Sequence, residues 1–151
     1  MADCIFCKIV KGEIPSSKIW EDSGHIAILD IFPNVKGQAL VIPKKHLSSY
    51  VFDIDDENFT KLLLAAKMAG RLLDKALGAI RTAAVMEGME VDHAHIKLYP
   101  LYHKKTEKFE PVVAPKEVFF EKYAGYVTSL HGPKANIAEL NELAEKIRNS
   151  K

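Results

Sequence analysis

A chain of 151 residues with 48% hydrophobic and 27% charged residues has the composition of one ordinary globular domain. Its formal net charge of +1 argues against bulk binding to nucleic acid or to an anionic membrane surface. No segment has the character of a membrane-spanning helix or of a signal peptide, so the sequence predicts a cytoplasmic protein.

The first half of the chain is predicted to form three short strands and then a long helix. Strand-forming residues between turn signals predict strands over residues 17–22, 25–30 and 38–42, and Pro43 ends the third. Apolar residues then recur at helical spacing behind an acidic start, which predicts a helix over residues 56–77.

The second half is predicted to add two strands and then a tail of different character. Strands are expected over residues 81–86 and 91–99. Residues 104–116 are charged and contain two prolines, which is typical of a loop, whereas residues 117–126 and 137–147 are predicted helices. This order of elements indicates an antiparallel sheet in an α+β domain.

The fifth predicted strand carries the most informative pattern. Side chains alternate between the two faces of a strand. Ala94, Ile96 and Leu98 would therefore face a core. The polar residues would share the opposite face and line a site, and they are His93, His95, Lys97 and Tyr99.

Cysteine and histidine residues at separate places in the chain indicate one metal site. Cys4 and Cys7 form a C-x-x-C, His93 and His95 form an H-x-H, and His46 follows an apolar run. Two thiolates and two imidazoles would complete a closed tetrahedral zinc site. One histidine of the H-x-H would then remain for chemistry.

Each of these features also has an ordinary structural explanation. The two cysteines could be small core residues, His46 a solvated loop histidine, and the H-x-H a structural feature of its strand. A redox role for the C-x-x-C would need a βαβ context, which the predicted elements lack. The joint occurrence of these features favours a common site over separate explanations.

Three blocks of the sequence resemble the histidine triad (HIT) superfamily of nucleotide hydrolases and transferases. They read C-I-F-C-K-I-V-K-G-E-I-P-S, L-D-I-F-P-N-V-K-G-Q-A-L-V-I-P-K-K-H and V-D-H-A-H-I-K-L-Y-P, in the order and spacing of the family. The resemblance implies a five-stranded antiparallel sheet with a long helix, paired as a homodimer through that helix and a neighbouring strand. It predicts a HIT-like domain over residues 1–100 and a C-terminal helical extension over residues 101–151 that packs on the same domain.

The resemblance also implies the metal site and the nucleophile. In the zinc-bearing branch, a structural zinc ion would be bound by Cys4, Cys7, His46 and His93. The middle histidine of the triad, His95 here, would attack the α-phosphorus of a nucleotide conjugate and form a nucleotidyl-histidine intermediate.

The substrate-binding residues that the resemblance implies lie in the first two blocks. Asp30 would bind the ribose hydroxyl groups of the nucleotide. Phe6, Ile9 and Ile31 match the positions that enclose the base, although simple core packing explains these three residues equally well.

The sequence departs from the family pattern around the phosphate. Lysine stands at the third histidine position, where Lys97 could hold a phosphate oxygen as a point charge. Met89 and Glu90 stand where the family commonly has a glutamine and a hydroxyl residue, and Leu101 stands where it often has an arginine. The tail offers His131 as a further polar group, with a solvated loop as the simpler interpretation.

Two classes of function follow from these residues. The first is a hydrolase or nucleotidyltransferase acting on a dinucleoside polyphosphate or a nucleoside phosphoramidate through His95. The alternative is a non-catalytic, zinc-stabilised domain that binds nucleotides or proteins. His95, Asp30 and the zinc ligands favour the enzyme, whereas the changes at Met89, Glu90 and Lys97 favour the alternative.

Overall fold

A computed structural model describes residues 4–102 and 134–150 of the chain. Within them, five strands form one antiparallel sheet in the order β1-β2-β3-β5-β4, which confirms the predicted fold class. The strands are β1 (Lys18–Glu21), β2 (His25–Leu29), β3 (Ala39–Pro43), β4 (Arg81–Val85) and β5 (Ile96–Leu101). The helices are α1 (Ile5–Lys11), α2 (Asp56–Leu77) and α3 (Ile137–Arg148), with a 3-10 turn, η1 (Val51–Asp53).

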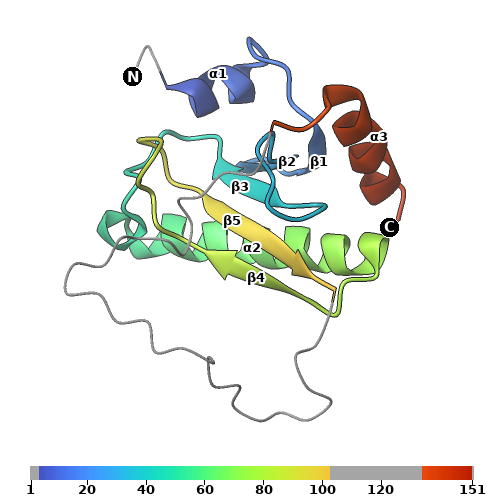
Figure 1. Ribbon diagram of the computed structural model, residues 1–151. Helices are drawn as coiled ribbons and strands as arrows, with labels where there is room; N and C mark the ends of the chain where they lie inside the picture. Colours follow the sequence, from blue (N-terminus) through green and yellow to red (C-terminus); the bar gives the residue numbers. More distant parts are fainter. Residues whose placement is uncertain (1–3, 103–133, 151) are drawn as a thin grey trace, which may run out of the picture.

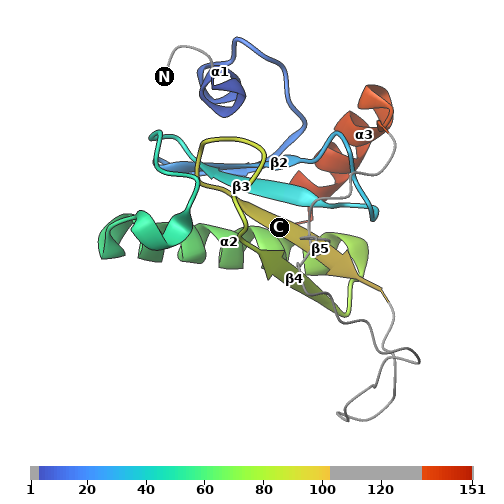
Figure 2. The same cartoon turned by 60° about the vertical axis from the view of Figure 1, so that its left-hand side comes forward.

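Helices cover both faces of the sheet, with α1 and α2 on opposite sides (Figures 1 and 2). The larger core lies between the sheet and helices α2 and α3, and it includes Leu73, Ile96 and Ile147. A smaller core lies on the other face, where Phe6 of α1 packs against Ile26, Ile28, Leu40 and Ile42. The smaller core matters for function because it holds α1 against the sheet face on which Phe6 also contacts His95.

Helix α2 has the bounds that the sequence predicts, because a capping residue in the sequence marks each of its ends. The Asp55 carboxylate accepts a hydrogen bond from the Asn58 backbone N–H at 2.9 Å and caps the first turn. At the other end, Gly78 adopts the left-handed conformation with a φ of +66°, which glycine tolerates without steric cost.

Helix α1 was not predicted, and β5 begins later than predicted. The seven residues of α1 include β-branched side chains with weak helix propensity, so the helix depends on the packing of Phe6 and on Gly12 as its C-cap. The strand predicted over residues 91–99 is observed only from Ile96 to Leu101. Its ladder with β3 ends at Val41–Ile96, because Pro43 has no N–H and its carbonyl oxygen faces the His93 ring.

Helix α3 joins the larger core although it comes from the tail of the chain. Leu140, Ala144 and Ile147 are buried against the sheet and α2. Ser17 donates a hydrogen bond to the Asn141 side-chain oxygen at 2.7 Å and so connects the start of the first strand region to the helix. The predicted helix over residues 137–147 is therefore present, whereas the one over residues 117–126 lies outside the described residues.

Candidate metal centre and active site

Four side chains from three parts of the fold meet at one end of the sheet. Cys4 is the N-cap residue of α1 and Cys7 lies on its first turn. His46 follows β3, and His93 lies shortly before β5. One ligand atom of each residue lies within 4.8 Å of all the others, so the predicted metal ligands are brought together.

The spacing of these atoms fits a tetrahedral ion. Bond lengths of about 2.0 Å to nitrogen and 2.3 Å to sulfur place two nitrogens about 3.3 Å apart and a nitrogen and a sulfur about 3.6 Å apart. The two Nδ1 atoms of His46 and His93 are 3.3 Å apart. The Cys4 and Cys7 sulfurs lie 3.4 Å and 3.6 Å from His93 Nδ1, and Cys7 Sγ lies 3.4 Å from His46 Nδ1.

The His93 ring is oriented for metal binding by its second nitrogen. His93 Nε2 lies 2.9 Å from the Pro43 carbonyl oxygen, and as an N–H it would donate there and leave Nδ1 as the ligand atom. Burial lowers the pKa of His93 and favours the neutral ring that a metal needs. Burial also raises the pKa of the Cys7 thiol, so metal binding there displaces a proton.

His95 is buried beside this cluster. Its Nδ1 atom faces a backbone carbonyl oxygen, whereas in His93 the Nε2 atom does so. The His95 Nδ1 atom lies 2.8 Å from the His93 carbonyl oxygen, a distance at which an Nδ1–H donates a hydrogen bond and leaves Nε2 with a lone pair. Burial lowers the pKa of His95, and the Lys97 charge lowers it further, so the ring is neutral near pH 7. The Phe6 ring packs edge-on against His95, with centroids 5.2 Å apart. A neutral imidazole held in this way has the features of a nucleophile.

Lys97 carries two acidic neighbours. Its ammonium nitrogen lies 2.8 Å from Glu87 Oε1 and 3.3 Å from Glu90 Oε2. Burial lowers the pKa of Lys97, but its hydrogen bond to Glu87 and the charge of both carboxylates outweigh burial and raise that pKa above its ordinary value. Lys97 is therefore a buried cation that is held by two carboxylates.

The loop before β5 adds a residue that the sequence-based interpretation did not contain. Met89, at the position of the family glutamine, is 82% exposed. Glu87, which sequence reasoning did not single out, is the closer partner of Lys97. A signal for it existed, because a lysine on a strand face otherwise lined by buried histidines requires a nearby carboxylate.

Asp30 follows β2 and is held in a polar network. Its carboxylate accepts hydrogen bonds from the Phe32 backbone N–H at 2.8 Å and from the Gln38 amide at 2.7 Å. Gln38 in turn accepts from the Asn34 backbone N–H at 2.7 Å. Asp30 is thus oriented by the turn that joins β2 to β3, and each carboxylate oxygen keeps acceptor capacity for a further donor such as a hydroxyl group.

The three residues proposed for base binding have different environments. Phe6 is buried and Ile9 is partly buried in the smaller core, which agrees with the core-packing alternative for these two residues. Ile31 is 38% exposed and is available to a ligand.

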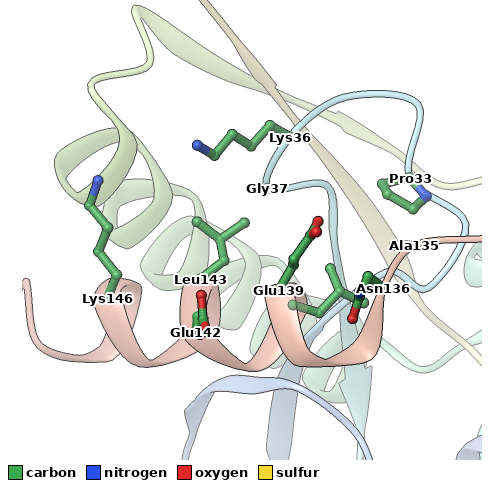
Figure 3. Close-up of a pocket in the computed structure, with 10 residues that line it drawn as sticks. Pro33, Lys36, Gly37, Ala135, Asn136, Glu139, Glu142, Leu143 and Lys146 are labelled. Atoms are coloured by element: carbon green, nitrogen blue, oxygen red, sulfur yellow. The ribbon is translucent and has the colours of Figure 1, made fainter.

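A groove of about 550 Å³ lies between α3 and the turn that joins β2 to β3 (Figure 3). Leu140 and Leu143 are apolar lining residues from α3, and the side chains of Lys36 and Glu139 lie on opposite sides of the groove. None of its lining residues is among the predicted catalytic, metal or nucleotide-binding residues.

Within residues 4–102 and 134–150, no helix is both long and apolar enough to cross a membrane.

Comparisons with known proteins agree with this geometry. The family model described as "HIT domain" matches residues 11–104 of the chain. Adenosine 5'-monophosphoramidase HNT1 of Saccharomyces cerevisiae is 38% identical over 124 residues, which cover 80% of this chain and 76% of that protein.

Solved structures have the same fold. A Hit-like protein involved in cell-cycle regulation from Bartonella henselae has a TM-score of 0.70 and 27% identity, covering 100% of this chain and 98% of that one. A Zn-bound histidine triad family protein from Mycobacterium smegmatis has a TM-score of 0.62 over 99% of this chain and 93% of that one. At 23% identity, the second comparison supports the fold alone.

Proposed function

This chain belongs to the HIT domain family, and on that premise we propose that it hydrolyses or transfers the nucleotidyl group of a nucleotide conjugate. The observation that carries this proposal is His95. Its buried, neutral ring is oriented through Nδ1 by the His93 carbonyl oxygen, so that Nε2 is the atom left to attack. The relative named adenosine 5'-monophosphoramidase makes adenosine 5'-phosphoramidates the first substrates to test.

The proposed reaction has two displacement steps at phosphorus. His95 Nε2 attacks the α-phosphorus, the bond from phosphorus to the leaving nitrogen or oxygen breaks, and the leaving group departs with a proton taken from solvent, which the later hydrolysis of the intermediate returns. Water then attacks the nucleotidyl-histidine, releasing the nucleoside monophosphate and restoring the imidazole. Asp30 would hold the ribose hydroxyl groups, Ile31 would contact the base, with Phe6 and Ile9 packed behind it in the smaller core, and Lys97 would face the phosphate.

We further propose that the bound metal is zinc and that its role is structural. Two thiolates and two imidazoles suit Zn²⁺, and four protein ligands leave no position for a water nucleophile. The metal would fix α1 and the His93 segment, which carries the backbone oxygen that orients His95.

The alternative function is a zinc-stabilised domain that binds without catalysis. The pairing of Lys97 with two glutamates favours it, because a neutralised lysine holds a phosphate less strongly than a free one. The extension over residues 101–151 is proposed to belong to the same domain in either case, which the packing of α3 into the larger core supports.

Mass spectrometry distinguishes the two functions. Adenosine 5'-phosphoramidate mixed with the wild-type protein is expected to give AMP, with a transient adenylyl adduct on the peptide that contains His95. Acid quenching at short times should trap this adduct. Binding of the nucleotide without adduct or product would favour the non-catalytic alternative.

We also propose that the protein is a homodimer formed through α2 and β4. Leu64 and Met68 of α2 are 55% and 52% exposed, although the helix is buried along its opposite side. A shallow groove of about 270 Å³ runs between α2 and the edge strand β4, lined by Leu63, Ala84 and other largely apolar residues. A second copy placed on a two-fold axis would cover this apolar surface.

Replacing Leu63 with glutamate is expected to convert the dimer to monomers, because it places a charge in the proposed apolar contact. Light scattering should give twice the 16.9 kDa chain mass for wild type and the single-chain mass for the variant. Ile137→Glu is the matched control, since Ile137 is 48% exposed at the start of α3. A monomeric wild type at micromolar concentration would contradict the proposal.

A further inference from the structure

The residue after Asp30 is hydrogen-bonded directly to the segment that begins α3. The Ala135 backbone N–H donates to the Ile31 carbonyl oxygen at 2.9 Å, and Figure 3 shows Ala135 beside the turn that carries Pro33. Ala135 comes directly before Asn136, the N-cap residue of α3. The backbone of Ile31 is therefore connected to the first turn of a helix that packs in the larger core.

The residue before Asp30 is connected to the same helix through Ser17. This serine is 5% exposed and uses its carbonyl and hydroxyl groups for separate contacts. Its carbonyl oxygen accepts a hydrogen bond from the Leu29 backbone N–H at 2.9 Å, and its hydroxyl donates to the Asn141 side-chain oxygen at 2.7 Å. Because Asn141 belongs to α3, this one helix holds the chain on both sides of Asp30.

The contacts to α3 differ in effect from the hydrogen bonds within the turn. The bonds from Phe32 and Gln38 fix the Asp30 carboxylate relative to the turn itself. The far end of the turn is placed on the sheet by the Tyr102 hydroxyl, which donates to the Lys36 carbonyl oxygen at 2.7 Å. The near end, which carries Asp30, is placed by α3. Loss of the contacts to α3 would therefore let Asp30 shift while the turn keeps its internal hydrogen bonds.

We propose that Ser17 and Asn141 are positioning residues through which α3 sets the place of Asp30 and so strengthens binding of the ribose hydroxyl groups. This inference rests on the proposed function, because it takes Asp30 as the group that binds the ribose. Helix α3 lies beyond residues 11–104, which match the family model. The inference therefore adds to the nucleotide site a helix from outside the matched domain.

The selectivity of the protein for an intact ribose is the quantity that tests this role. AMP and 2′,3′-dideoxy-AMP differ only in the two ribose hydroxyl groups, and calorimetry measures their affinities without turnover. We expect the wild type to bind AMP about tenfold more tightly, because hydrogen bonds to a carboxylate are among the stronger ones. Ser17→Ala should reduce this ratio to about threefold, because hydrogen bonds weaken steeply when their geometry is disturbed.

Ser150→Ala is the matched control, because Ser150 donates a hydrogen bond of the same length, 2.7 Å, to the Ile147 carbonyl oxygen at the other end of α3. It should keep the wild-type ratio of affinities. Asn141→Ala should behave like Ser17→Ala, and the double variant should be no worse than either, because both changes break one contact. A wild-type ratio in both Ser17→Ala and Asn141→Ala would overturn the inference.

Hydrogen exchange of the wild-type protein gives a second test that needs no variant. If α3 strengthens nucleotide binding, then by linkage the bound nucleotide strengthens the attachment of α3. Exchange of the Ala135 amide and of the first turn of α3 should therefore slow when AMP saturates the protein, and it should slow less with 2′,3′-dideoxy-AMP. Equal exchange with the two nucleotides would overturn the inference, because it would mean that α3 does not respond to the ribose hydroxyl groups.

The same measurements separate this inference from the proposed catalytic function. The expected ratios without turnover of a phosphoramidate would support the role of α3 and refute catalysis. Turnover with a ratio that neither Ser17→Ala nor Asn141→Ala changes would refute the inference alone. Equal wild-type affinity for the two nucleotides, or binding of neither, would refute both the inference and the assignment of Asp30 to the ribose.

Discussion

Replacing Cys4 with serine is expected to abolish stoichiometric zinc binding and to lower the free energy of unfolding by about 3 kcal/mol or more. The ion would bind the folded chain but not the unfolded one, so its loss removes stabilisation that reaches about 4 kcal/mol at a free concentration 1,000 times Kd. The loss should be concentrated at α1, because Cys4 and Cys7 connect this short helix to the His46 and His93 segments. Metal analysis and urea unfolding at fixed protein concentration measure the two effects.

The wild-type protein provides the control for this prediction. A chelator should lower its stability to that of Cys4→Ser, and added zinc should restore wild type but not the variant. Because His93 also supplies the carbonyl oxygen that orients His95, the metal-free protein should lose activity along with stability. Wild-type protein that carries no metal, or that is equally stable without it, would contradict the prediction.

The elements of the fold that could be predicted are those with complete local signals. Helix α2 has an aspartate cap, a helical apolar pattern and a terminal glycine, and its predicted bounds match the observed Asp56–Leu77. Helix α1 has only the terminal glycine, Gly12, among these signals, and it depends on the contact between Phe6 and the sheet. Short helices of this kind are determined by tertiary packing, which a periodicity argument does not detect.

In the candidate site too, residues placed by a local sequence pattern could be predicted, whereas contacts that depend on how the chain folds back could not. Alternation along one segment correctly placed Ala94, Ile96 and Leu98 in the larger core, even though regular strand geometry begins only at Ile96. The joining of Cys4 and Cys7 with His46 and His93 followed from ligand chemistry and from the resemblance. Glu87 could not be assigned in this way, because its partnership with Lys97 depends on how the preceding loop folds back onto β5.

Replacing His95 with asparagine is expected to reduce turnover of an adenosine phosphoramidate by about 10⁴-fold or more and to eliminate the adenylyl adduct. The asparagine amide can still donate to the His93 carbonyl oxygen, as His95 Nδ1 does over 2.8 Å in the native protein. It has no atom equivalent to Nε2, so only the nucleophile is removed. Zinc content and the free energy of unfolding should therefore stay close to wild type.

Lys97→Ala is the comparison that separates the nucleophile from its charged surroundings. This variant keeps His95 but leaves Glu87 and Glu90 without the ammonium group, so both carboxylates would repel the phosphate. It should still form the adenylyl adduct, slowly, and it should retain zinc because Lys97 is not a ligand. An adduct in His95→Asn would assign the nucleophile to another residue. Equal and complete inactivity of both variants, with intact zinc sites, would mean that charge neutralisation by Lys97 is as necessary as the nucleophile itself.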